Sequence, residues 1–159
     1  MTSQYTKDVT KAIKDIAKKC SKIVDIKTED NIWIGPPKGT NKQGTYFVSD
    51  ITFEMKNSKV IIFQLCDTQA NDPKKIFGDF FTAFLAREVK NLYFIIPPEK
   101  ETEINNICST SLSILKNRYD VKESRIISHR VFVVKKGSYE DITERIKILA
   151  HEERWGYNE

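Results

Sequence analysis

One segment, residues 46–96, constrains the fold more than any other part of the chain. Residues 46–56 alternate between apolar and polar side chains, which predicts a strand with one apolar face and one mostly polar face. Asn57-Ser58 then fits a two-residue hairpin turn. Residues 59–66 are nearly all apolar, which is typical of a central strand covered on both faces. The segment therefore opens with a predicted β-hairpin.

A helix and a further strand follow this hairpin. Asp72-Pro73 supplies an N-cap oxygen and a proline at the first helical position, and the helix is expected to run to about Arg87. Residues 91–96 form the next strand, which ends at Pro97-Pro98. If the strands on either side of the helix are parallel, they make a right-handed βαβ unit.

The rest of the chain adds elements on both sides of this core. The predicted elements are an amphipathic helix over residues 4–24, a short strand over 31–34, a helix over 102–119, a strand over 130–135 and a last helix that opens at Ser138. The order α-β-β-β-α-β-α-β-α predicts an α/β fold, with a mixed sheet flanked by helices.

Length and composition favour one globular domain over residues 1–159. Apolar residues make up 40% of the chain and charged residues 30%, which is ordinary for a protein that folds in water. The longest apolar run, Leu92 to Ile96, is far shorter than the ~20 residues that span a bilayer. The polar start of the chain has no hydrophobic signal core. We therefore expect a cytoplasmic protein with no membrane partner.

The cysteines and histidines do not form a metal-binding pattern. Cys20, Cys66 and Cys108 are far apart, and only His129 and His151 could join them. A zinc cluster is therefore not expected, and we predict three reduced, mostly buried thiols.

The segment from the first strand of the hairpin to the strand after the helix resembles the core of the PD-(D/E)xK nuclease superfamily. Asp50 lies in the first strand, and Gln64-Leu65-Cys66 ends the second. The resemblance covers about residues 5–97 in the order of elements, and it implies a restriction-endonuclease-like three-layer fold. Nucleases of this superfamily place an Asp near the start of one strand and Glu-x-Lys at the end of the next. The two carboxylates hold Mg²⁺, and the lysine orients or polarises the attacking water.

By this resemblance, Asp50, Gln64 and Cys66 stand at the three catalytic positions. Gln64 keeps a carbonyl oxygen but lacks the charge of a glutamate, and a single anion attracts Mg²⁺ weakly. Cys66 is expected to be a neutral thiol that cannot replace an ammonium group. We therefore expect severely impaired cleavage and no cofactor; an active site would hold Mg²⁺ at Asp50.

Two other alignments of the catalytic triplet are possible. Asp67-Thr68-Gln69 is an acid-x-polar triplet just beyond the second strand, and Glu54-Met55-Lys56 matches acid-x-Lys literally, although on the same strand as Asp50. A purely structural interpretation also remains open, in which Asp50 is an exposed strand acid and Gln64 an inward side chain satisfied by hydrogen bonds.

Lysines provide the main indication of nucleic-acid binding. On the predicted first helix they share a narrow arc, and the Gly- and Pro-rich loop after residue 34 adds two more. The seven candidates are Lys7, Lys11, Lys14, Lys18, Lys22, Lys38 and Lys42. A straight row of lysines suits the phosphates of a duplex, whereas surface helices also carry lysine for solubility.

Together these patterns predict a DNA-associated protein, either a DNA-binding module or an accessory nuclease subunit. Two alternatives remain: an active Mg²⁺-dependent DNA endonuclease with an unorthodox site, and a protein-interaction or assembly module that keeps only the fold. A homo-oligomer or another protein partner is compatible with all three.

Overall fold

The computed structural model describes residues 3–35, 45–67, 73–86, 88–122 and 125–159. Within them the chain forms one five-stranded sheet in the order β1-β2-β3-β4-β5. The strands are β1 (Ile23–Gly35), β2 (Thr45–Met55), β3 (Val60–Leu65), β4 (Val89–Ile96) and β5 (Ser128–Val133). The first three strands pair antiparallel, and β3-β4 and β4-β5 pair parallel, so the sheet is mixed.

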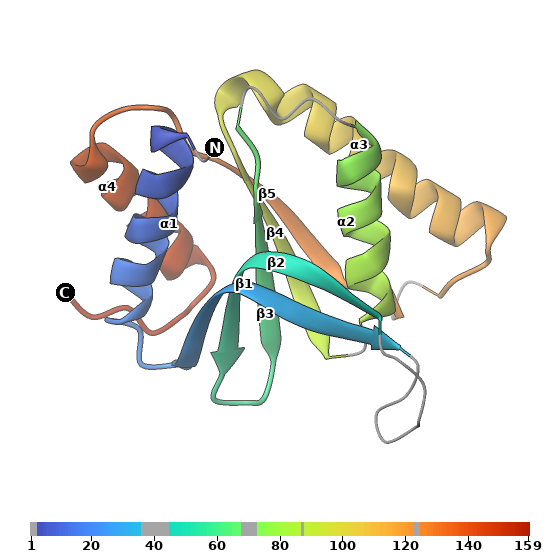
Figure 1. Cartoon of the computed structure of the whole chain (residues 1–159), viewed down its shortest axis with the longest axis horizontal. Coiled ribbons are helices and arrows are strands. Elements are labelled where there is room, and N and C mark those ends of the chain that lie inside the picture. Colours follow the sequence, from blue (N-terminus) through green and yellow to red (C-terminus); the bar gives the residue numbers. More distant parts are fainter. Residues whose placement is uncertain (1–2, 36–44, 68–72, 87, 123–124) are drawn as a thin grey trace.

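Helices cover both faces of this sheet (Figure 1). The α-helices of the described residues are α1 (Gln4–Ala17), α2 (Pro73–Leu85), α3 (Glu101–Ser113) and α4 (Tyr139–Glu152). α1 and α4 lie side by side on one face, and α2 and α3 lie on the other. A 3₁₀ turn, η1 (Pro98–Lys100), leads into α3, and a π-helical turn, η2 (Ile114–Arg118), ends it.

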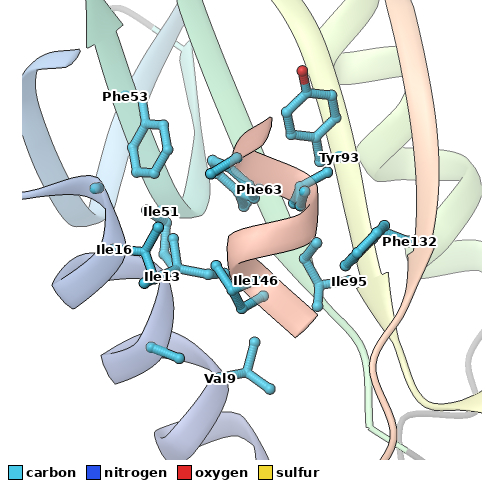
Figure 2. Packing of buried hydrophobic residues seen from close by; sticks show 14 of the residues in the cluster. Val9, Ile13, Ile16, Ile51, Phe53, Phe63, Tyr93, Ile95, Phe132 and Ile146 are labelled. Atoms are coloured by element: carbon cyan, nitrogen blue, oxygen red, sulfur yellow. The ribbon is translucent and has the colours of Figure 1, made fainter. Parts of the chain in front are cut away.

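Each face of the sheet has its own hydrophobic core. Figure 2 shows the core under α1 and α4, which contains Val9, Ile13 and Ile16 of α1 together with Phe53 of β2 and Phe63 of β3. The opposite core contains Ile62 of β3, Phe80 of α2 and Ile104 of α3. The nearly continuous apolar run of β3 has the expected cause, because this strand is buried on both faces.

The predicted order of elements and the mixed α/β sheet are confirmed. The predicted parallel pairing on either side of α2 is also confirmed. Cys20, Cys66 and Cys108 are free and buried, as expected. No helix among the described residues is both long and apolar enough to cross a bilayer.

The predicted end of the first helix is wrong. α1 ends at Ala17 rather than at residue 24, and β1 begins at Ile23 rather than at residue 31. The backbone N–H of Ser21 donates to Gly156 and that of Lys22 to Trp155, so the carboxyl-terminal segment holds residues 21–22 in a turn. These long-range bonds override the local helical pattern, and Val24 is 61% exposed instead of packed in the core.

Candidate functional site

Asp50 and Gln64 meet where the ladder between β2 and β3 ends. The last backbone pair of the ladder is Ile51 with Phe63. Beyond it, the N–H of Leu65 donates to Asp50 Oδ2 at 2.7 Å, and the N–H of Asp50 donates to Gln64 Oε1 at 3.1 Å. Side chains therefore take the place of main-chain partners and hold the two strand ends together.

Two residues of α2 complete this cluster. Lys75 Nζ lies 3.3 Å from Asp79 Oδ2, one helical turn apart. A hydrogen bond also links Asp79 to Gln64, and the charge of Lys75 acts on both Asp50 and Cys66. The helix after β3 thus brings a cation and a second carboxylate to the end of the hairpin. The sequence contains Lys75 and Asp79 as a helical i,i+4 pair, but the pairing alone does not show that it faces the strand ends.

Burial sets the protonation behaviour of the cluster. Desolvation raises the pKa of Asp50, opposed by the N–H of Leu65 and by Lys75. Desolvation also raises the pKa of Asp79, although Lys75 opposes it. For Cys66, burial raises the pKa to about 12, so this residue is a neutral thiol at neutral pH. Burial lowers the pKa of Lys75, but the carboxylates of Asp79 and Asp50 outweigh this effect and keep the ammonium charged.

This arrangement does not fit a Mg²⁺ site. Within the described part of the chain, no group of three or more His, Cys, Asp or Glu side chains could hold a metal ion. Gln64 Oε1 accepts from the N–H of Asp50, Asp50 Oδ2 accepts from Leu65, and Asp79 is paired with Lys75. One oxygen of each of these three side chains is therefore already held by a hydrogen bond or ion pair within the protein.

Asp67 and Glu54, the acids of the two alternative triplets, pair with residues outside this cluster. Asp67 Oδ1 forms an ion pair with Lys136 Nζ at 3.0 Å, beyond the end of β5. Thr68 and Gln69, the other two residues of that triplet, lie outside the described residues. Glu54 pairs with Val60 at the opposite end of the β2-β3 ladder, beside the hairpin turn.

Asp50 also lines a pocket of about 580 Å³ beside α1, which we call the lysine pocket. Leu65 joins Asp50 in its wall, and four predicted lysines of α1 line it from the other side: Lys7, Lys11, Lys14 and Lys18. Lys22 lies in the turn after α1, outside the lining of this pocket. Lys38 and Lys42 lie outside the described residues. The structure therefore brings the first predicted acid and four of the predicted lysines to one place.

Neighbouring contacts fix part of this pocket and leave most of its cations exposed. Lys11 Nζ lies 4.6 Å from the centre of the Tyr139 ring, and Asp15 accepts a hydrogen bond from the Tyr139 hydroxyl. Lys7, Lys11 and Lys18 are exposed. The four lysines face three carboxylates, Asp15, Glu29 and Asp50. The ammonium groups of these exposed lysines already lie in solvent, so an anionic ligand can reach them directly.

No known protein-family model matches the chain, and neither does any curated protein or solved structure. The likeness to the PD-(D/E)xK superfamily therefore rests on the order of elements and on Asp50.

Proposed function

We propose that this chain is a DNA-associated protein with a PD-(D/E)xK-like fold whose site no longer supports efficient cleavage. One observation carries the proposal: Asp50 lines the same pocket as Lys7, Lys11, Lys14 and Lys18. A nuclease-like strand end and a row of lysines on a separate element thus converge. That convergence suits binding of a phosphate backbone at the place where a related nuclease would cut it.

The spacing of the lysines supports contact with successive phosphates. From Lys7 to Lys18 the row covers eleven helical steps, which is roughly 16 Å at 1.5 Å per residue. Ammonium groups along such a row gain free energy by releasing counterions from the nucleic acid. Among the residues that the structure describes, the lining of the lysine pocket contains no aromatic side chain on which an unpaired base could stack. Duplex DNA is therefore the expected ligand.

The chemistry of the cluster supports impaired cleavage. The neutral thiol of Cys66 cannot stabilise developing phosphate charge. Asp50 Oδ2 and Gln64 Oε1 each accept a backbone hydrogen bond across the strand ends. Lys75 supplies a positive charge from α2, but its partner Asp79 neutralises it.

Binding can be tested by fluorescence anisotropy with a labelled DNA duplex over a series of salt concentrations. The test variant is Lys7→Gln/Lys11→Gln/Lys18→Gln, and the matched control Lys56→Gln/Lys90→Gln/Lys122→Gln removes three exposed lysines elsewhere. We expect the test variant to bind more weakly. Its slope of log affinity against log salt should be smaller by roughly 2 to 3, because each phosphate contact contributes about 0.9. The control should keep most of the wild-type slope.

Cleavage is tested with the same DNA, together with branched and single-stranded forms, in Mg²⁺, Mn²⁺ or EDTA. We expect both the wild type and Asp50→Asn to bind the DNA without cutting it. Metal-dependent cutting that Asp50→Asn abolishes would replace this proposal with an active endonuclease. Absence of binding at low salt would instead favour a domain that keeps the fold for a protein partner.

A further inference from the structure

A second pocket, of about 550 Å³, lies along β1 and β2 and shares no lining residue with the lysine pocket. We call it the acidic groove. Its wall includes four acids, Asp25, Asp30, Glu54 and Glu88, and the aromatic residues Trp33 and Tyr46. The lining also contains two lysines, Lys27 and Lys90, so carboxylates outnumber cations among the described residues of the wall. The proposed DNA-binding function makes no use of this groove.

Like charges oppose each other at one end of the groove. Asp25 of β1 stands directly across from Glu54 of β2 in the strand register. Two carboxylates in this position repel each other and destabilise the pairing. Lys27 Nζ is 3.9 Å from Asp25 Oδ2, which is a loose, exposed ion pair. A bound cation would relieve this repulsion.

Thr52 gives an independent indication of a ligand. It stands opposite Lys27 in the register, lines the groove and is only 6% exposed. Its Oγ1 is buried and has no hydrogen-bond partner among the described residues. Buried hydroxyl groups are normally bonded. A ligand N–H donor would satisfy this oxygen once the Thr52 side chain turns it towards the groove.

The other end of the groove offers aromatic surface. Trp33 and Tyr46 are also cross-strand partners, and their ring centres lie 4.9 Å apart at an angle of 79°. In such an edge-to-face pair, the ring that contributes its edge keeps both faces free of its partner. Tyr46 is 53% exposed. Aromatic faces beside carboxylates attract organic cations, and guanidinium groups stack on them well.

We propose that the acidic groove binds an extended organic cation that carries ammonium or guanidinium groups along a linear chain. The acids at Asp25 and Glu54 would hold one charged group, Thr52 Oγ1 would accept a hydrogen bond, and the Trp33-Tyr46 pair would hold a second group. From Asp25 to Trp33 the strand covers eight residues, up to roughly 26 Å. This length suits the side chains of an extended basic peptide, because a small polyamine such as spermidine is too short to reach both ends and a metal ion would occupy one end only.

Binding is measured by calorimetry and by tryptophan fluorescence at low ionic strength, with spermidine and with a short arginine-glycine peptide as probes. Trp33 reports on the groove, because the second tryptophan, Trp155, is fully buried. We expect wild-type protein to bind the peptide with a change in fluorescence that Trp33→Phe abolishes. Spermidine, which is too short to reach both ends, should bind more weakly than the peptide, and equal or tighter binding of spermidine would contradict an extended ligand.

Two variants separate the groove from general attraction to negative charge. Asp25→Asn/Glu54→Gln should bind about ten-fold more weakly, which corresponds to one lost charge-assisted contact. The matched control Asp120→Asn/Glu144→Gln removes two exposed acids elsewhere and should bind like the wild type. Thr52→Val keeps every charge and should still weaken binding several-fold. Absence of binding by the wild type, or an equal loss in the control, would overturn the proposal.

Discussion

Gln64 has a structural role in this fold. It is 2% exposed, its Oε1 accepts from the N–H of Asp50, and its Nε2 donates to the carbonyl of Val48 at 3.4 Å. Gln64→Ala would leave the N–H of Asp50 without this acceptor, so the free energy of unfolding should fall by about 1–3 kcal/mol. Urea denaturation measures this loss. Gln4→Ala, at an exposed position, is the control, and an equal effect of both changes would contradict the structural role.

Asp50 gives a prediction about pH. Burial raises the pKa of its carboxyl group in the folded protein above the ordinary value of 3.8. The ionised form is therefore less favourable in the folded state than in the unfolded state, and this cost disappears as pH falls through the raised pKa. Asp50→Asn keeps an oxygen for the N–H of Leu65 and carries no charge. It should be more stable than the wild type at pH 7, and the difference should shrink on acidification towards pH 4. Thermal melts across this range measure it, and a growing difference would mean that the folded-state pKa is lowered.

The sequence identified part of this cluster because strand patterns place residues relative to a hairpin. Asp50 and Gln64 were expected near each other, since the start of one strand lies beside the end of the next. Lys75 and Asp79 could not be found in the same way. Their helical spacing predicts contact with each other, but the face that α2 turns towards the strand ends depends on tertiary packing.

At the scale of elements, the local sequence pattern correctly predicts where α4 begins. Ser138 was predicted to open the last helix, and its Oγ accepts from the N–H of Asp141 at 3.1 Å. Ser138→Ala should lower the free energy of unfolding by about 1 kcal/mol, because the first turn loses its cap. Ser138→Asp should restore most of the loss, since aspartate caps helices equally well. Equal stability of all three proteins in urea denaturation would show that α4 does not depend on this cap.

The junction of α1 and β1 shows the opposite case, in which the local signal was overridden. The apolar spacing of the first helix continues past its true end, so periodicity alone extends it to residue 24. The backbone instead turns at residues 18–22, where it bonds to a segment more than 130 residues away. A pattern confined to one window of sequence contains no information on such a partner, which is why this boundary could not be predicted.

For the whole molecule, these bonds join the two ends of the chain and fix α1 against the sheet. Besides the bonds of Ser21 and Lys22, the N–H of Asn158 donates to the carbonyl of Lys19 at 3.0 Å. Trp155, fully buried, packs against Phe53 and Phe63 with ring centres 5.1 and 5.8 Å away. The carboxyl-terminal segment therefore belongs to the core under α1 and α4, and through α1 it helps to position the lysine pocket.

Gly156 tests this coupling. Its φ is +78°, and a Cβ at this position would meet the Oγ of Ser21 in close contact. Gly156→Ala should therefore destabilise the protein by about 1–2 kcal/mol from the backbone conformation, with a further loss from the clash. Ser21→Ala removes the clashing oxygen and should recover only that further loss. The double variant should thus be more stable than the sum of the two single changes predicts, as measured by a double-mutant cycle in urea. Strict additivity would mean that the Ser21 side chain rotates aside without cost.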